Sequence, residues 1–468
     1  QPSRSPSALR PDPQLPFVEM AWSPSQMQEF FNHSVLPLVW PGQQVTAVAI
    51  EHMSYKVGKQ CEIRYSLQFG DPTRSQSRWA AVTFANENTL GEIYRHHYGG
   101  DGGAAAGSTP PPVVFLPEYR CLVEFFPRDW GLPGLIHAMD PEEMASLLPA
   151  WPADAGRSQV DPEAERSREL PKVEVLRYRF HKRCVLRYIV EAPDCGAPLE
   201  VIGKVHKSGA LAVRVAQTQS ILQPQAAACG LIIPKPLGVV QEWGLLLMER
   251  VPGTVMKPLV QQARAPQQFK EAIGLAAATL ARLHRFRFES QAVLSLQTKL
   301  EKLRRRAASL HLVAPSLAKQ AEALLQQIAR LSAQFTAVAP SFVHGGFRPG
   351  QLLMDKGQIG IVDFDSACLG DPAIDVGKFM ASLHYTAERR ANNEFRQLAT
   401  YFLSEYQARV PEHRVAERIH LFLSAFLIQI ALHTFERWPY DYGQAGPDSL
   451  PVCLLQEAAT CLAGPTAR

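Results

Sequence analysis

Hydrophobic and polar positions follow two different rhythms along the chain. Residues 50–65 and 173–188 alternate apolar and polar side chains around a turn-like centre, which predicts a β-hairpin in each segment. Beyond Gly253, apolar residues recur at helical spacing over 267–287, 294–311, 317–335, 389–408 and 415–438. A β-rich half followed by a helical half predicts an α+β protein with two lobes.

The two predicted hairpins are similar residue by residue. Segment 50–65 aligns without a gap to 173–188 at an offset of 123, and six positions are identical. Segment 121–127 also matches 246–252, with Glu124 opposite Glu249, and Ala81 stands at the same offset of 123 from Lys204. The alternative is a chance similarity, because short β-patterns recur often. A true repeat predicts that the first β-rich part is a partial copy of the second.

Two stretches break these patterns and suggest where domains end. Residues 96–112 are rich in Gly and Pro, and 149–171 are rich in Pro, Ala and charge. The length of 468 residues favours two or three compact units. We predict a disordered N-terminus, a β-rich domain without catalytic residues, a linker, a β-lobe and a helical lobe, over residues 1–16, 17–150, 151–171, 172–253 and 254–468.

Composition excludes several classes of protein. The net charge of +4 is small and the basic residues are scattered, which argues against nucleic acid as a partner. The basic cluster 302–306 is interpreted as a solvated helix face in preference to a phosphate-binding patch. The eight cysteines form no C-x-x-C pair, which predicts reduced thiols in a cytoplasmic protein. The apolar run 419–435 contains His and Gln, so a buried helix is expected there and no membrane span.

The residues between 341 and 379 are the ones that suggest chemistry. They contain a short apolar strand, a loop beginning at His344, a second strand that ends at Asp363, and a Gly-Asp-Pro turn. Phosphoryl transfer from ATP needs Mg²⁺ held by oxygen ligands, a group that orients the attacking hydroxyl, and cations that offset the developing charge. Carboxylates at the ends of strands can supply the first two.

This stretch resembles the aminoglycoside phosphotransferases and choline-kinase-like phosphotransferases. Their loop has the pattern H-G-D-x-x-x-x-N, and their metal strand D-F/W-D/E is followed by G-D-P-x-x-D. Here HGGFRPGQ occupies 344–351, DFD occupies 363–365, and the closing turn spans 370–375. The resemblance covers about 172–440. It implies a bilobal protein-kinase-like fold that uses ATP and Mg²⁺ to phosphorylate a small hydroxyl-bearing substrate, and the first β-rich domain would then pack or bind a protein partner.

The resemblance also implies roles for individual residues. Asp363 would bind Mg²⁺ with Gln351 in the place of the family's second metal ligand, and Asp365 would either join them or cap a turn. The remaining expectations are Arg348 near the transferred phosphate, Lys204 on the α- and β-phosphates, Glu249 and Val251 in the adenine hinge, and structural roles for His344, Asp371 and Asp375. The family's lysine usually pairs with a glutamate on the next helix, but residues 211–225 contain none.

One departure from the family pattern bears directly on activity. Position 346, where the family has its catalytic aspartate, is Gly346. Glycine can neither accept a proton nor orient a nucleophile, so transfer is expected to be impaired. Three hypotheses remain: an atypical small-molecule kinase, a pseudokinase that binds nucleotide or acts as a scaffold, and a single-codon variant of an active lineage.

Overall fold

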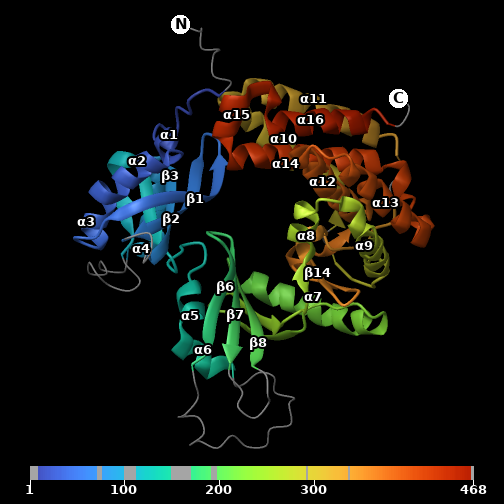
Figure 1. The fold of residues 1–468 in the computed structure, drawn as a ribbon, viewed down its shortest axis with the longest axis horizontal. Helices are drawn as coiled ribbons and strands as arrows, with labels where there is room; N and C mark the ends of the chain where they lie inside the picture. The colour runs from blue at the N-terminus through green and yellow to red at the C-terminus, as the bar shows by residue number, and fades with distance from the viewer. Residues whose placement is uncertain are drawn as a thin grey trace, which may run out of the picture. The chain divides into compact units, whose positions relative to one another are not determined.

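The computed structural model describes residues 9–70, 76–99, 112–148, 170–190, 198–290, 293–335 and 338–464. Residues 1–8 of the predicted disordered N-terminus and 151–169 of the predicted linker lie outside these residues, whereas 9–16 are described and include the buried Asp12 and Leu15. The chain forms two compact units. The β-rich unit comprises Pro11–Gln217 and Lys235–Arg250, and the helical unit comprises Gln1–Arg10, Thr218–Pro234 and Val251–Arg468. The antiparallel sheets of one unit and the helices of the other confirm the predicted α+β class (Figure 1).

Two five-stranded antiparallel sheets make up most of the β-rich unit. The first has the order β1-β2-β3-β5-β4 and the second the order β6-β7-β8-β10-β9, so the two sheets have one topology. A helix follows the third strand of each, α4 (Glu87–Tyr98) in the first copy and α7 (Gly209–Ala228) in the second. The strands are β1 Val45–Lys56, β2 Gln60–Phe69, β3 Gln76–Ala85, β4 Val114–Leu116, β5 Cys121–Phe125, β6 Lys172–Arg179, β7 Arg183–Val190, β8 Leu199–His206, β9 Pro236–Val240 and β10 Leu245–Glu249.

Hydrogen bonds extend the repeat upstream of both sheets. Asp12 accepts from the hydroxyl of Tyr55 at 2.7 Å and from the N–H of Gly58 at 2.8 Å, at the turn of the first hairpin. Asp129 accepts from the hydroxyl of Tyr178 at 2.9 Å and from the N–H of His181 at 2.8 Å, at the turn of the second hairpin. Each copy therefore begins with a buried aspartate that holds the turn of its own first hairpin.

The helices that follow these aspartates are also equivalent. In the first copy the Tyr65 hydroxyl donates to the carbonyl of Ala21, in α1 (Val18–Ala21), at 2.6 Å. In the second copy the Tyr188 hydroxyl donates to the carbonyl of Ala138, in α5 (Leu135–Met139), at 2.8 Å. Tyr65 and Tyr188 are one of the identical pairs in the hairpin alignment, so the repeat is supported by contacts as well as by topology. Three further short helices lie in this unit: α2 Pro24–Phe30, α3 Leu36–Val39 and α6 Pro141–Leu147.

Strand register corrects one detail of the predicted repeat. Cys61 on β2 pairs with Phe84, and the equivalent Cys184 on β7 pairs with Val205. Lys204 directly precedes Val205, so its counterpart in the first sheet is Thr83, and the prediction of Ala81 was wrong. The connection between these strands is two residues longer in the first copy, and a constant sequence offset cannot account for that difference.

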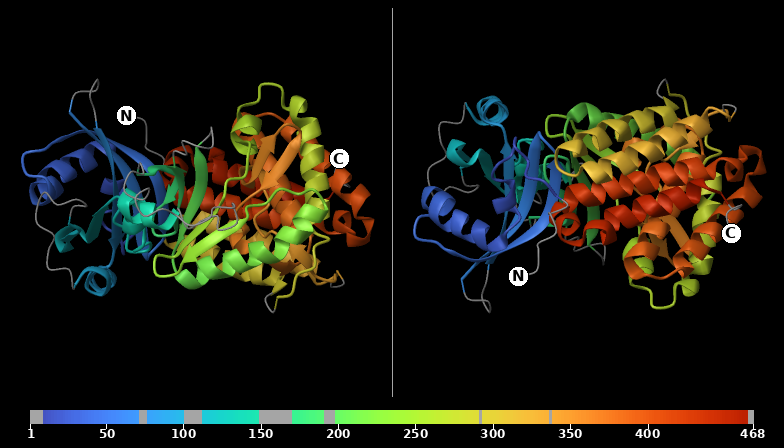
Figure 2. Two further views of the ribbon diagram at one scale, coloured as in Figure 1. Left: turned by 90° about the horizontal axis from the view of Figure 1, so that it is seen from below. Right: turned by 90° about the horizontal axis from the view of Figure 1, so that it is seen from above.

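The helical unit is organised around α14 (Ile419–Arg437), most of which is buried. It packs against α10 (Leu296–Ser309), α11 (Pro315–Ser332), α12 (Ala373–Arg390) and α16 (Leu450–Leu462), and Figure 2 shows several of these long helices side by side. Within the described residues, α14 is also the one helix whose length and mean hydropathy of 1.4 would allow a membrane span, but 67% of its apolar window is buried inside the protein. This burial is typical of a core helix. The other helices are α8 Met256–Gln262, α9 Lys270–Leu283, α13 Glu394–Arg409 and α15 Pro439–Ala445.

Two small sheets in the helical unit carry the loops of the predicted site. The hairpin of β14 (Leu352–Asp355) and β15 (Gln358–Ile361) pairs with β11 (Thr254–Val255). The strands β13 (Ser341–Val343), β16 (Cys368–Gly370) and β12 (Val293–Leu294) form the other sheet. The loop 344–351 thus runs from β13 to β14, and Asp363 follows β15 closely.

Candidate catalytic loop and its surroundings

The loop after β13 requires a glycine at its second residue. Gly345 has φ of +68°, in the left-handed region that glycine adopts without strain. A side chain at this position would also collide with the carbonyl oxygen of Ser366. The strand that contains Val343 and the turn that contains Ser366 can therefore approach closely, which brings the loop next to the Asp363 segment.

His344 holds this loop together from inside. Its Nε2–H donates to the carbonyl of Val362 at 3.1 Å, and its Nδ1 accepts from the N–H of Gly346 at 3.2 Å. Burial lowers the pKa of His344, although the nearby carboxylates of Asp375 and Asp363 act in the opposite direction. A neutral, doubly hydrogen-bonded and buried imidazole is suited to hold the loop, and the structural role expected from the resemblance stays a prediction.

Asp375, in the first turn of α12, ties the same loop to the helical core. Its carboxylate accepts from the N–H of His344 at 2.6 Å, from the N–H of Phe347 at 3.3 Å and from Nε2–H of His284 at 3.3 Å. Burial alone would raise the pKa of Asp375, but the hydrogen bond and charge of His284 hold it below its usual value. Asp371, just upstream, accepts two bonds from the guanidinium of Arg418 at 2.8 and 2.7 Å. Both aspartates position the backbone.

The predicted metal ligands lie on one side of the loop. The amide of Gln351 donates to Asp363 Oδ2 at 3.3 Å, and its Oε1 accepts from Arg348 Nε at 2.7 Å. Asp363 has φ of +76°, a strained conformation for a residue other than glycine. Such strain is common at functional positions, because the surrounding structure must hold it.

These oxygens fit a hard cation only in part. Asp363 and Asp365 supply carboxylate oxygens from one short turn, Phe364–Ser366, which is the donor chemistry that Mg²⁺ prefers. The oxygen of Gln351 faces Arg348, so the amide would have to turn before that oxygen could reach a cation beside Asp363. We therefore regard Asp363 as the residue best suited to hold Mg²⁺, and the ligand role of Gln351 remains a prediction.

The missing aspartate leaves space at position 346. A Cβ added to Gly346 would lie 3.1 Å from His344 Nδ1 and 3.3 Å from its Cε1. This contact is tight but involves only one side chain, and φ of Gly346 is outside the left-handed region. A carboxylate could therefore be introduced with a shift of a few tenths of an ångström.

The residues predicted to contact the nucleotide are Lys204 and Glu249 in the β-rich unit and Val251 in the helical unit. Lys204 is buried in the middle of β8, paired with Val185 on β7 and with Leu246 on β10. Glu249 ends β10, where its N–H donates to the carbonyl of Lys235 at 2.9 Å and its exposed carboxylate lies 3.7 Å from the Lys235 ammonium. Val251 is buried and belongs to the helical unit. The geometry gives Glu249 no special environment, so its cofactor role remains a prediction based on resemblance.

Sequence reasoning missed Lys378, on α12. Its Nζ donates to the carbonyl of Gly345 at 2.7 Å, so an ammonium group lies beside the catalytic loop. Burial and the charge of Arg348 lower the pKa of Lys378 to about 8. The signal was present, because residue 378 is three positions after Asp375 and therefore projects from a neighbouring face of the same helix.

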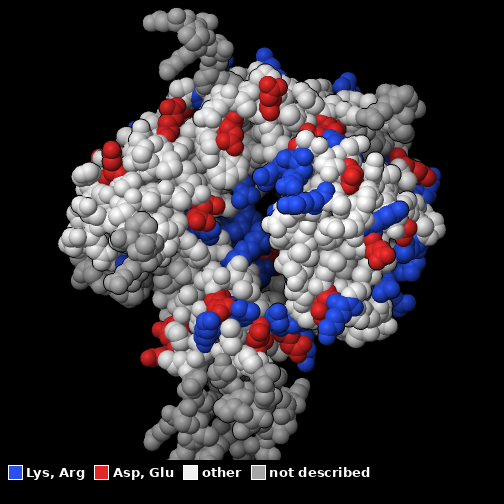
Figure 3. Space-filling model, viewed as in Figure 1, with Lys and Arg blue, Asp and Glu red and all other residues white. Residues whose placement is uncertain are grey.

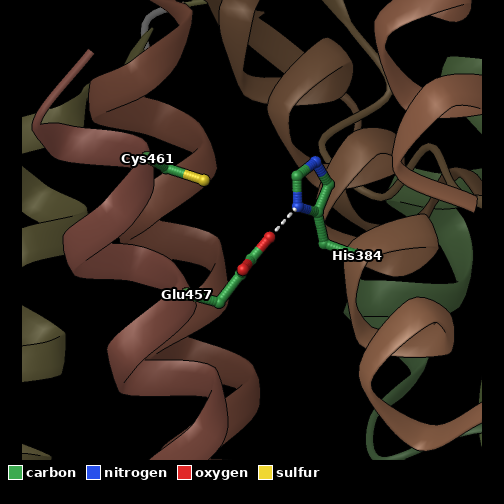
Figure 4. Close-up of side chains that lie close together, drawn as sticks. All are labelled: His384, Glu457 and Cys461. Carbon is green, nitrogen blue, oxygen red and sulfur yellow. Dashed lines mark hydrogen bonds and ion pairs between the residues drawn. The ribbon is translucent and has the colours of Figure 1, made fainter. Parts of the chain in front are cut away.

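A second group of potential metal ligands lies elsewhere in the helical unit. His384 on α12 and Glu457 and Cys461 on α16 point toward one another, and His384 Nδ1 lies 2.6 Å from the Glu457 carboxylate (Figure 4). The same carboxylate accepts from Arg396 at 2.7 Å and 3.1 Å. Because the guanidinium already uses both oxygens and would repel a cation, we assign this group a structural role between α12, α13 and α16.

A sheet lobe with a helix after its third strand, followed by helices and an HG-type loop, agrees with the bilobal fold that the sequence predicted. Residues 185–413 match the model of the phosphotransferase enzyme family APH, which confirms the predicted resemblance over this part of the chain. Among curated proteins there is no match.

Solved structures with a similar course of the chain include members of the same two groups. ADP-bound aminoglycoside phosphotransferase APH(2'')-Ib is 17% identical with a TM-score of 0.42, over 65% of this chain and 99% of that one. Choline kinase from Cryptosporidium parvum Iowa II is 11% identical with a TM-score of 0.48, over 69% and 95%. Plasmodium vivax ethanolamine kinase is 11% identical with a TM-score of 0.42, over 63% and 82%. Similarity at this level says nothing about the substrate of this protein.

Proposed function

We propose that this protein binds Mg²⁺ and ATP and transfers the γ-phosphate slowly to a hydroxyl group of a small molecule. The observation that carries the proposal is the buried hydrogen-bond network of the loop, in which Asp375 and His344 hold the backbone beside Asp363. A loop that had lost every function would have no need for this costly arrangement of buried polar groups. The match of residues 185–413 to a phosphotransferase family supports the same function.

The chain's own residues would have the following roles in binding and transfer. Asp363, with Asp365 close in sequence, would hold Mg²⁺, which neutralises charge on the phosphates when it is bound. Lys204 would bind the α- and β-phosphates, and Arg348 would offset charge that develops on the transferred group. The N–H groups of His344 and Phe347 are held by Asp375, and the N–H of Gly346 is held by His344, so this backbone is organised in advance of substrate binding.

Gly346 limits the rate in this proposal. A positioned base contributes roughly 10²- to 10⁴-fold to such reactions, and glycine supplies none of it. The same observation favours a second candidate function, a pseudokinase that binds nucleotide without turnover. The two candidates share nucleotide binding and differ in whether transfer occurs.

The first experiment measures binding of ATP in the presence of Mg²⁺ by titration calorimetry. We expect binding by the whole protein, loss of the Mg²⁺-dependent part in Asp363→Ala, and no change in Asp448→Ala, an exposed aspartate of the same unit. If the unmutated protein binds no ATP, or if Asp363→Ala binds it as well as the unmutated protein, the proposed function is wrong.

A second experiment separates the two candidates. Gly346→Asp should raise ATP turnover in the presence of an accepted hydroxyl compound by about 10²-fold or more, because it restores the missing carboxylate at a position with room for it. Gly346→Asn is the matched control, since it has the same size but accepts no proton. No gain in turnover in Gly346→Asp would favour the pseudokinase, and an equal gain in both variants would mean that the carboxylate does not act as a base.

A further inference from the structure

A small cavity lies against the catalytic loop within the helical unit. Its volume is about 120 Å³, and Gly345 of the loop forms part of its wall. Phe422 and Phe426 of α14 and Lys299 and Lys302 of α10 also line it. A cavity of about 150 Å³ holds one benzene molecule, so this smaller one accommodates the part of a ligand that contains about five non-hydrogen atoms.

The charge around this cavity has one sign. Lys299 and Lys302 line it, and the Lys378 ammonium lies beside it on the carbonyl of Gly345. Among the described residues that line the cavity there is no Asp or Glu. In Figure 3, basic side chains also gather on the helical unit in the region between the labels α8 and α14 of Figure 1.

Lys299 is the residue whose environment is most unusual. Its Nζ lies 4.2 Å from the ring centroid of Phe426 and donates to the amide oxygen of Gln429. Burial, followed by the charges of Lys378, Arg306 and Lys302, lowers its pKa to about 7. Arg306 has its own partner, since it donates to both carboxylate oxygens of Glu436 at 2.9 and 2.7 Å.

Holding ammonium groups together in a partly buried place costs free energy unless an anion joins them. The carboxylates of Asp375 and Asp363 near the catalytic loop oppose the lowering of the pKa of Lys378. The charges that act on Lys299 are all positive. An anion bound in the cavity would offset this repulsion and accept hydrogen bonds from Lys299 and Lys302, whereas a polycation would increase it.

We propose, on the basis of the proposed function, that this cavity is the acceptor site and that the acceptor is a small anion carrying a hydroxyl group, either a hydroxycarboxylate or a phosphate ester. Its anionic end would face Lys299 and Lys302, and its hydroxyl would face the Gly345–Gly346 backbone. In the transfer step the hydroxyl oxygen bonds to the γ-phosphorus of ATP. The bond from that phosphorus to the β,γ-bridging oxygen breaks, ADP departs with the electron pair, and the hydroxyl proton passes to water.

Binding to the whole protein without nucleotide tests this inference. Four probes differ mainly in charge: glycerate, glycerol 3-phosphate, neutral glycerol and cationic choline. We expect at least one of the two anions to bind tenfold or more tightly than glycerol and choline, measured by ligand-observed NMR. Which anion binds distinguishes a carboxylate from a phosphate as the recognised group. Anions that bind no better than glycerol would overturn the inference.

Lysine variants test whether the anion binds in this cavity. Lys299→Met should weaken anion binding about tenfold, and Lys319→Met, an exposed lysine on α11, should leave it unchanged. If Lys299→Met does not fold, Lys302→Met at an exposed position gives the same test with a smaller expected loss. Anion binding that is unchanged in the soluble variants would place the anion elsewhere and disprove the inference.

ATP binding and anion binding, measured separately, distinguish a failure of the proposed function from a failure of the acceptor assignment. Asp363→Ala should lose Mg²⁺-dependent ATP binding and keep anion binding. Absence of ATP binding in the unmutated protein, with anion binding retained, would refute the kinase and leave the anion site standing. Normal ATP binding without a preference for anions would refute only the acceptor assignment.

Discussion

The two copies of the β-sheet have the same topology but differ in side chains at equivalent positions. In each, a buried aspartate holds a tyrosine hydroxyl and the N–H of the hairpin turn, Asp12 in the first copy and Asp129 in the second. The residue at the turn is Gly58 in the first copy and His181 in the second. The second copy contains Lys204 on its third strand, where the first has Thr83. The sheet topology is thus kept in a copy that lacks the lysine.

His181, at the turn of the second hairpin, makes contacts that Gly58 in the first copy cannot make. Its side chain is 1% exposed, and it lies between two carboxylates of the first sheet: Nε2–H donates to Glu124 at 2.7 Å, and Nδ1 lies 3.4 Å from Glu62. A Cβ on Gly131 would lie 2.6 Å from the Cα of His181, so only glycine allows this approach. The turn of the second hairpin is therefore inserted against the first sheet, and a buried ionic cluster holds the two copies together.

We expect the largest loss of unfolding free energy from His181→Ala. Removing one partner of a buried ion pair leaves Glu124 uncompensated and costs about 3–5 kcal/mol. His137→Ala is the matched control, because His137 pairs with Glu143 at an exposed site and little change is expected. Chemical denaturation followed by tryptophan fluorescence measures both, since the Trp130 ring lies 4.5 Å from that of His181. Equal losses in the two variants would mean that the cluster does not join the copies.

The pH dependence of the unfolding free energy also tests the role of His181, and we expect a somewhat smaller change in it. Burial alone would lower the pKa of His181, but Glu124, with Glu62 and Asp129, raises it to about 10 from 6.5. The charged imidazole therefore stabilises the fold fully below pH 6.5, and this contribution is lost as the pH rises toward 10. Burial raises the pKa of Asp129 to about 6, and His181 lowers that of Glu62 to about 2 against the effect of burial, so both titrate below this window.

The measurement is the free energy of unfolding between pH 7 and 10 for the unmutated protein and for His181→Ala. We expect a decrease of a few kcal/mol in the first and a markedly flatter profile in the second, since each pKa unit corresponds to about 1.4 kcal/mol. Parallel profiles would contradict the assignment of a charged His181.

Two tyrosine variants test whether Asp12 and Asp129 are equivalent, and we expect the smallest losses of unfolding free energy from them. Tyr55→Phe removes a hydrogen bond to Asp12, and Tyr178→Phe removes one to Asp129. Each should lower the unfolding free energy by about 1.5–3 kcal/mol, the usual contribution of a hydrogen bond to a charged group. Similar losses would support two equivalent anchors. A loss in only one variant would show that the copies share geometry without sharing energetics.

The sequence by itself was sufficient for the class of fold, for the hairpin repeat and for the order of the catalytic loop and the Asp363 strand. These features are local: alternation, helical spacing and motif spacing are properties of neighbouring residues. It also predicted five helical segments, and α9, α10, α11, α13 and α14 overlap them, although α11 begins two residues earlier and α13 ends one residue later than predicted. Helix α12 was missed because its first turn belongs to the motif and its polar residues, such as Asp375 and Lys378, are buried or partly buried.

Tertiary structure decided which residues meet. The aspartate anchors depend on contacts such as Asp129 with His181, more than fifty residues apart, and on a strand register that shifts the equivalent of Lys204 from Ala81 to Thr83. The lysine-lined cavity combines α10, α14 and the loop at Gly345. A pattern along the chain records which face of an element is apolar, but burial, register and the sum of charges in a cavity arise only when distant elements pack together.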